Sequence, residues 1–309
     1  MRYLVTGGAG FIGSHLVEAL LAQGAEVTVL DNLSTGIKGN VPDKARLVVG
    51  HAGDAALLDQ LLPGCAGIFH LAAVSSVQAS LDRPVEVHED NLTATLALLE
   101  AARRHNVPRF VFSSSAAIYG DTHGKAAKED MKSNPLSHYA VQKLAGEYYC
   151  QVYAQVYGLE TVCLRYFNIF GPRQRADSPY SGAIAKFLDA ARVERAPSIF
   201  GDGSQTRDFC PVGNVVAANI AAMTKPAADI SGAIFNIGTG NSVSIREIVD
   251  VVRKIFPRTP EPQFLPARSG EVPHSRADIS LALEKLGYQP FGDFKESLKA
   301  LAELHLLPG

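Results

Sequence analysis

The run Gly7-Gly8-Ala9-Gly10-Phe11-Ile12-Gly13 separates a short apolar stretch from an amphipathic one. The stretch before it, residues 3–6, is short, partly β-branched and bounded by glycine, which predicts a buried strand. The stretch after it, residues 12–23, has apolar residues at helical spacing and ends at a glycine, which predicts a helix. The glycines at positions 7, 10 and 13 form a G-x-x-G-x-x-G variant of the dinucleotide fingerprint. They permit a tight turn and let the backbone approach a pyrophosphate at the helix N-terminus.

Asp31 supports this interpretation, because it directly follows the next predicted strand, residues 26–30, and lies 18 residues after Gly13. A carboxylate at this place accepts hydrogen bonds from both ribose hydroxyls and repels a 2′-phosphate. The sequence therefore predicts NAD, rather than NADP, as the dinucleotide.

Short apolar runs alternate with amphipathic segments through the first half of the chain. Further strands are predicted at residues 46–49, 67–71, 109–113 and 160–165, and helices at 55–62, 85–105 and 136–157. Strands separated by helices form parallel βαβ units, and helices cover both faces of their sheet. The sequence therefore predicts a doubly wound, Rossmann-type α/β fold.

The pattern changes after residue 170, where Gly171-Pro172-Arg173 interrupts it. Beyond this point, short strands (197–200, 233–237) mix with helices (184–195, 212–223, 245–256, 294–304). We predict a dinucleotide-binding domain over 1–170 and a smaller C-terminal α/β lobe over 171–309, with some segments of the lobe returning to the first sheet.

The composition excludes several classes of protein. Of the 309 residues, 47% are hydrophobic and 19% are charged, which is typical of a globular chain. A net charge of -2 leaves no basic surplus for nucleic acid, and no apolar run reaches the roughly 18 residues of a membrane span. The four cysteines have no paired short spacing, which argues against disulfides or zinc and favours a reducing compartment. We expect a cytoplasmic protein without a metal site and with neither nucleic acid nor membrane as a partner.

Tyr139 and Lys143 lie four residues apart near the start of a long predicted helix, so both face the same side. A free tyrosine has a pKa near 10, but a neighbouring cation lowers the pKa of an acid. The pair therefore predicts a tyrosine base assisted by a lysine.

Ser113, Ser114 and Ser115 end the predicted strand 109–113, and the carboxyl ends of such strands line the ligand crevice of a doubly wound fold. A hydroxyl there can bind the reacting oxygen and pass on a proton. We predict Ser115 as the third catalytic residue, beside Tyr139 and Lys143.

Taken together, these motifs resemble the extended short-chain dehydrogenase/reductases, and within them the UDP-sugar 4-epimerases. The resemblance covers nearly the whole chain. It is carried by residues 5–13, 31–33, His70-Leu71-Ala72-Ala73, residues 112–120, residues 139–143 and residues 164–172.

The resemblance implies a set of cofactor contacts and a set of substrate contacts. Cofactor contacts are expected at Gly7, Gly10, Phe11, Ile12, Gly13, Asp31, Asn32, Asp54, Ala55, Leu71, Ala72, Ala73, Ser75, Asn91, Ser113, Tyr139, Lys143 and Phe167. Among these, Asp54 is similar to the acid that touches the adenine, and Phe167 to the residue beside the nicotinamide. Contacts with a UDP-sugar are expected at Ser115, Asn168, Ile199, Phe200, Arg207, Arg268, Glu271 and Ser275. The run Arg207-Asp208-Phe209 resembles a uridine and diphosphate contact.

The implied reaction is reversible. Tyr139 takes the proton of the sugar 4-hydroxyl while NAD takes the hydride from the same carbon, and the 4-keto sugar turns before the hydride returns. Ser275 stands where relatives confined to non-acetylated sugars carry a tyrosine, so the pocket has room for an N-acetyl group. This predicts UDP-N-acetylglucosamine and UDP-N-acetylgalactosamine as substrates, with UDP-glucose and UDP-galactose also accepted, because a pocket rejects smaller substrates only weakly.

Several alternatives stay open at this point. A UDP-glucuronate 4-epimerase would share these motifs, as would a non-catalytic dinucleotide sensor or a dehydrogenase that releases NADH. Dehydratases and decarboxylases of the superfamily carry a carboxylate just after the serine, whereas this chain has Ala116 and Ala117. The resemblance further implies a homodimer, in which the helices 85–105 and 136–157 of two subunits form a four-helix bundle.

Overall fold

The computed structural model describes residues 1–175, 182–267 and 272–304. Seven strands form one sheet in the order β11-β6-β5-β4-β1-β2-β3, and every neighbouring pair is parallel. Their bounds are β1 Arg2–Thr6, β2 Glu26–Asp31, β3 Arg46–Val49, β4 Gly67–His70, β5 Arg109–Ser115, β6 Glu160–Tyr166 and β11 Ala233–Ile237. The predicted doubly wound fold is confirmed.

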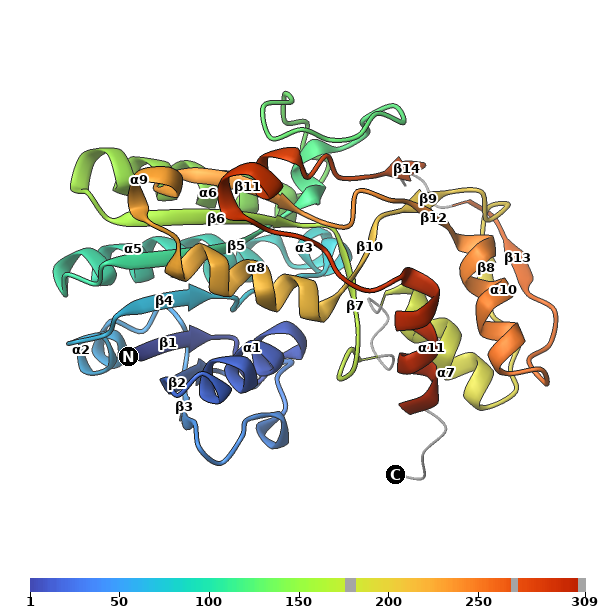
Figure 1. The fold of residues 1–309 in the computed structure, drawn as a ribbon, viewed down its shortest axis with the longest axis horizontal. Helices are drawn as coiled ribbons and strands as arrows, with labels where there is room; N and C mark the ends of the chain where they lie inside the picture. The colour runs from blue at the N-terminus through green and yellow to red at the C-terminus, as the bar shows by residue number, and fades with distance from the viewer. Residues whose placement is uncertain (176–181, 268–271, 305–309) are drawn as a thin grey trace.

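Helices cover both faces of this sheet (Figure 1). On one face lie α1 (Phe11–Ala22) and α8 (Val212–Thr224), and on the other lie α2 (Ala55–Leu61), α5 (Ala94–Arg104) and α6 (His138–Tyr157). Two neighbouring residues of β1 show why both faces of the sheet need to be covered. Val5 belongs to the apolar core under α1 and α8, whereas Leu4 belongs to the core under α2, α5 and α6, and both are fully buried. Each such side chain contributes roughly 1.5–3 kcal/mol of burial free energy.

The helix predicted over 85–105 is present over 84–104, with a wider turn inside it. The structure has α3 (Val77–Asp82), α4 (Pro84–His88), a π turn over Glu89–Thr93 and then α5. The wider turn is filled by Asn91, whose side chain binds the main chain of Val74 instead of facing solvent. Periodicity alone does not show such a turn, since the apolar pattern continues through it.

The C-terminal lobe has its own apolar core between α7 (Ala183–Arg192), α10 (Ile245–Ile255) and α11 (Phe294–Leu304), beside the sheet in Figure 1. Its strands are short. They are β7 Asn168–Phe170, β8 Ser198–Phe200, β9 Thr206–Arg207, β10 Phe209–Pro211, β12 Val243–Ser244, β13 Gln263–Leu265 and β14 His274–Ser275. Between lobe segments the chain returns to the first sheet with α8, α9 (Ala227–Ile230) and β11, so the domain boundary at residue 170 stays a prediction.

The strand order reverses at the carboxyl ends of β1 and β4, where a fold of this kind is expected to form its ligand crevice. From β1 the chain moves to β2 on one side, whereas β4 leads to β5 on the other. Ligands of open α/β sheets bind where the order reverses in this way. The glycine-rich run follows β1 directly, so it lies at this crevice.

Candidate active site

The glycine-rich run folds as a turn with no room for side chains. Gly7 has a φ of +72°, and a Cβ on it would lie 2.7 Å from the main-chain nitrogen of Ala72. A Cβ on Gly13 would lie 2.2 Å from the carbonyl oxygen of Gly7. Gly10 caps α1 without a side-chain hydrogen bond, so the first N–H groups of the helix, at Phe11 and Ile12, can bind an anion. This backbone cradle fits a dinucleotide pyrophosphate.

Asp31 is fixed beside the same turn. It is 7% exposed, and its two carboxylate oxygens accept hydrogen bonds from the N–H groups of Ala9 (3.0 Å) and Leu33 (2.8 Å). Each oxygen keeps a second lone pair, which can accept a ribose hydroxyl. The neighbouring Asn32 is exposed, and its side-chain oxygen accepts the N–H of Ser34.

His70 holds the end of β4 in place. Its ring nitrogens lie 2.7 Å from the Thr6 hydroxyl and 2.9 Å from the Thr95 hydroxyl. The Thr95 hydroxyl donates to the carbonyl of Asn91, so it accepts from His70 Nε2, and Nδ1 accepts from Thr6. Burial, with a smaller effect from the charge of Lys143, lowers the pKa of His70 to about 3. His70 is therefore a neutral structural residue.

Leu71, Ala72 and Ala73 follow β4, and the first two lie next to the glycine turn. The Leu71 N–H donates to the carbonyl of Thr6 and the Ala72 N–H donates to its hydroxyl. Asn91 accepts the N–H of Val74 and donates to the Val74 carbonyl and to Gln142. These hydrogen bonds of Asn91 fix the main chain after β4 in place.

Three other predicted cofactor residues lie on the surface. Asp54, Ala55 and Ser75 are exposed, and the Asp54 carboxylate caps α2 by accepting two main-chain N–H groups. Their contacts with the cofactor stay predictions.

Tyr139, Lys143 and Ser115 converge at the carboxyl end of β5. The Lys143 ammonium donates to the carbonyl of Ser113 (2.8 Å) and lies 5.9 Å from the centre of the Tyr139 ring. Burial lowers the pKa of Lys143 to about 8, so the lysine is still largely charged at neutral pH. Tyr139 hydrogen-bonds to Ser115. The sequence predicts these three residues as a group, and the structure brings them together.

The direction of the Tyr139 pKa differs from the expectation that a nearby cation lowers it. Burial raises the pKa of the phenol, because loss of hydration disfavours the phenolate more than the hydrogen bond with Ser115 favours it. The side chain of Ser113 is engaged elsewhere, since its hydroxyl lies 3.0 Å from that of Tyr166.

Apart from Ser115, the predicted substrate contacts within the described residues lie on strands of the lobe, and the predicted cofactor residue Phe167 directly precedes them. Phe167 is buried, and Asn168 begins β7, which pairs with β10. Ser275 pairs in register with Arg207 across β14 and β9, so these two positions are neighbours. The Arg207 guanidinium donates to the carbonyls of Thr206 and Pro273.

Two other predicted substrate residues lie on β8. Ile199 is 1% exposed with its side chain in the lobe core, so only its main chain can face a ligand. Phe200 is half-buried. Arg268 and Glu271 lie outside the described residues.

Asp208 has a role that the sequence did not indicate. Its carboxylate is fully buried and accepts hydrogen bonds from the N–H and hydroxyl of Thr239 and from the N–H groups of Gly240 and Ala277. Burial raises its pKa despite these donors. The carboxylate joins the segment after β11 to the segment after β14, and protein donors occupy it.

Within the described ranges, no group of three histidine, cysteine or acidic side chains could hold a metal ion. The same part of the chain contains no helix with both the length and the apolar character needed to cross a bilayer.

Known proteins with similar sequences and structures indicate the family to which this chain belongs. Residues 3–238 match the NAD dependent epimerase/dehydratase family. A UDP-glucose 4-epimerase of Mycolicibacterium smegmatis is 41% identical over 299 residues, which cover 94% of this chain and 94% of that protein. A UDP-N-acetylglucosamine 4-epimerase of Methanobrevibacter ruminantium, solved with UDP-N-acetylmuramic acid, has a TM-score of 0.93 at 36% identity and covers 99% of this chain and 98% of its own. A UDP-glucuronic acid 4-epimerase of Bacillus cereus, solved with UDP-glucuronic acid and NAD, has a TM-score of 0.90 at 33% identity, with 99% of each chain covered.

By fold and site alone, the molecule is a Rossmann-type α/β protein with a glycine turn that fits a dinucleotide and a buried tyrosine and lysine at the end of β5. The matches then show that the chain belongs to the NAD dependent epimerase/dehydratase family. The resemblance to UDP-sugar 4-epimerases among the extended short-chain dehydrogenase/reductases is confirmed, as are the enzyme class, an isomerase, and NAD as the cofactor.

Proposed function

We propose that this enzyme interconverts the 4-epimers of UDP-N-acetylhexosamines, UDP-N-acetylglucosamine and UDP-N-acetylgalactosamine, and also accepts UDP-glucose and UDP-galactose. The observation that carries the reaction is the convergence of Ser115, Tyr139 and Lys143 at the crevice where the glycine turn lies. A sensor without catalysis has no need of this buried group.

The chain's own residues move the proton. NAD, when held along the glycine turn and by Asp31, supplies the hydride acceptor and donor. Tyr139 removes the proton of the sugar 4-hydroxyl and later returns one, while Ser115 hydrogen-bonds to the same oxygen. A positive charge on the neighbouring Lys143 favours the phenolate in general terms. In the free protein, burial raises the pKa of Tyr139 and the hydrogen bond with Ser115 opposes that rise. Positioning of the sugar between these groups supplies most of the remaining acceleration.

Ser275 supports the acetylated pair. It lies on β14 opposite Arg207, which we propose as a diphosphate contact because arginine binds phosphate oxygens in a bidentate manner. A serine there is half-buried and small, which leaves space where a bulky side chain would narrow the pocket. One structural relative is itself a UDP-N-acetylglucosamine 4-epimerase, and another acts on UDP-glucuronic acid, so the glucuronate is the alternative substrate.

Proton NMR of the purified enzyme tests the proposal. UDP-N-acetylglucosamine, UDP-glucose and UDP-glucuronate are supplied separately, first with the cofactor that copurifies and then with added NAD. We expect the anomeric signal of UDP-N-acetylgalactosamine to grow. Growth with UDP-glucose alone would keep the reaction and discard the role of Ser275, growth with UDP-glucuronate alone would select the alternative, and silence with all three would reject the proposed reaction. Continuous NADH production would instead favour a dehydrogenase.

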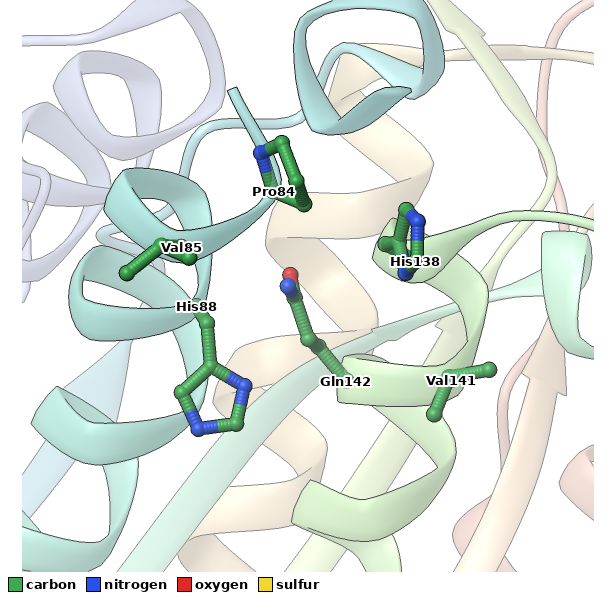
Figure 2. Close-up of a pocket in the computed structure, with 6 residues that line it drawn as sticks. All are labelled: Pro84, Val85, His88, His138, Val141 and Gln142. Atoms are coloured by element: carbon green, nitrogen blue, oxygen red, sulfur yellow. The ribbon is translucent and has the colours of Figure 1, made fainter. Parts of the chain in front are cut away.

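We also propose a homodimer formed through α4, α5 and α6. A stripe along α6 is apolar yet exposed: Val141 is 50%, Tyr148 59%, Val152 45% and Val156 65% exposed. Between α4 and α6 the same surface has a pocket of about 310 Å³ lined by side chains of both helices, among them Val85 and Val141 (Figure 2). Exposed apolar surface of this kind is typical of an interface, and two such helix pairs would form a four-helix bundle.

Sedimentation of Val152→Asp tests the dimer. A buried aspartate at the centre of the stripe is costly to desolvate, so we expect a monomer where the wild type is a dimer. Lys254→Asp, an exposed charge change on α10 in the lobe, is the control and should leave the dimer intact. Monomeric wild-type protein would reject this part of the proposal.

A cytoplasmic location is the last part of the proposal. It is supported by Cys65, Cys150, Cys163 and Cys210, which are all free thiols and all buried. Thiols persist in this state in reducing compartments. Cell fractionation with an antibody against the protein checks the location.

A further inference from the structure

A buried polar chain lies behind the proposed catalytic group. Its members are Ser114, Glu147, Arg165 and Tyr119, which are 2%, 1%, 3% and 2% exposed. None of them belongs to the proposed catalytic group. A buried ion pair contributes little to stability by itself, because the desolvation of both charges opposes their attraction. The arrangement therefore needs another explanation.

Two hydrogen bonds, only the second of which belongs to this polar chain, attach α6 to neighbouring residues at the end of β5. Lys143 donates to the carbonyl of Ser113 at 2.8 Å. One helical turn later, Glu147 accepts the hydroxyl of Ser114 at 2.5 Å. The next residue along the strand is Ser115. Two consecutive strand residues are thus held by two successive turns of the helix that carries Tyr139 and Lys143.

Helix and strand touch closely at this point. A Cβ on Gly146 would lie 2.6 Å from the ring of Phe112, so only glycine lets α6 approach β5 this far. The Lys143 ammonium lies 4.9 Å from the centre of the same ring. The register of α6 against β5 is therefore set by direct contact and by the two hydrogen bonds together.

Glu147 is held rigidly from its other side. The Arg165 guanidinium donates from Nε (2.9 Å) and Nη2 (2.8 Å) to its two oxygens. The third nitrogen of Arg165 donates to the hydroxyl of Tyr119 (2.7 Å) and to the carbonyl of Glu129 (3.0 Å). Tyr119 in turn donates to Asn236 on β11 (2.7 Å). The carboxylate thus has one permitted place, and so has the Ser114 hydroxyl that it accepts.

We infer that Glu147, acting through Ser114, is a positioning residue that sets the place of Ser115 relative to Tyr139 and Lys143. The inference deepens the proposed function, since it rests on the catalytic roles given there to those three residues. Removal of the hydrogen bond between Ser114 and Glu147 should leave substrate and cofactor binding intact and impair the proton-transfer step. A displacement of reacting groups by a fraction of an ångström is enough for such an effect.

Ser114→Ala is the variant of choice, because it removes the hydroxyl and keeps the ion pair. Glu147→Gln would leave Arg165 buried without its counter-charge and threaten folding. We expect kcat of Ser114→Ala to fall about tenfold with KM and the content of NAD unchanged within about twofold. Ser114→Thr keeps a hydroxyl and should restore most of the rate. Thr161→Val is the matched control, because it removes another buried hydroxyl that bonds to α6, the one that donates to the carbonyl of Cys150 (2.8 Å).

A second readout needs no turnover. The Tyr139 phenol is titrated by NMR of ring-labelled tyrosine in the holoenzyme, with Tyr139→Phe identifying its signal. The hydrogen bond with Ser115 lowers the pKa of Tyr139, so Ser114→Ala should raise that pKa by roughly half a unit while Thr161→Val should not. Equal rates and equal titrations for Ser114→Ala and Thr161→Val would overturn the inference. A wild type inactive on every UDP-sugar, together with a shifted titration in Ser114→Ala, would reject the proposed function and keep the positioning role.

Discussion

The carboxyl edge of the large sheet and the C-terminal lobe hold their side chains in different ways. At the edge, Asp31, His70 and Lys143 are 7%, 1% and 5% exposed, and main-chain or hydroxyl groups fix each of them. In the lobe, Arg207 and Ser275 are half-buried and lie on strands of two residues each. From this difference we propose that residues at the edge of the sheet determine the reaction, and that residues on the short strands of the lobe determine which sugar is accepted. Substitutions at the edge should therefore affect all substrates alike, whereas those in the lobe should discriminate between them.

The largest effect is expected for Tyr139→Phe, which removes the group that moves the proton. We expect kcat to fall about 10³-fold on every UDP-hexose that the wild type accepts, as measured by NMR of the 4-epimers. Tyr148→Phe is the control on the same helix, since that side chain is 59% exposed, and it should be fully active. A loss of activity confined to one sugar would contradict the expectation that substitutions at the edge of the sheet affect all substrates alike.

Lys143 should make the free energy of unfolding of the protein depend on pH. Its pKa falls from 10.5 to about 8 in the folded state. Between these values the unfolded chain binds more protons, so the free energy of unfolding rises with pH. The difference in unfolding free energy between wild type and Lys143→Met should grow by about 3 kcal/mol from pH 8 to pH 10.5 in urea titrations, equivalent to roughly 150-fold in the equilibrium constant. A constant difference would show that the lysine is not desolvated.

Gly13→Ala should prevent cofactor binding, since its Cβ would lie 2.2 Å from the carbonyl oxygen of Gly7. The backbone must move, and the cradle for the pyrophosphate moves with it. We expect NAD to bind at least about 100-fold more weakly in calorimetry. Gly39→Ala serves for comparison, because a Cβ there meets no atom within 4 Å. Undiminished NAD content in the Gly13 variant would contradict the cradle.

Ser275→Tyr sharpens the comparison from the lobe side, with the smallest effect of the four. We expect kcat/KM for the acetylated pair to fall about 30-fold, and that for UDP-glucose to change by less than about twofold. Both values come from the same preparation, so the second is the control for the first. An equal loss on both sugars would place Ser275 in general binding and not in selection.

The sequence was most informative where many residues share one pattern. All seven strands of the large sheet were predicted within two residues of their observed ends, because each combines a buried apolar run with flanking turn residues. The glycine turn, Asp31 and the group of Ser115, Tyr139 and Lys143 were likewise predicted, since each follows the end of a strand or begins a helix.

It was least informative where a contact joins distant segments. Strands of two residues, such as β9, β12 and β14, are too short to show periodicity. Nothing local distinguishes Asp208, which the fold surrounds with donors from residues 239, 240 and 277. Glu147 and Arg165 are 18 residues apart and meet only once α6 lies on the sheet. The raised pKa of Tyr139 also depends on its burial, which spacing alone does not give.

The place of β11 in the large sheet has a consequence for how the molecule is made. This strand is residues 233–237, yet it pairs with β6 as an edge of a sheet whose other members end by residue 166. During synthesis, β6 therefore presents an unpaired edge until about seventy further residues have left the ribosome. Exposed edges of this kind pair readily with other chains. A chain terminated after residue 170 should accordingly aggregate, and a productive expression fragment has to extend beyond residue 237.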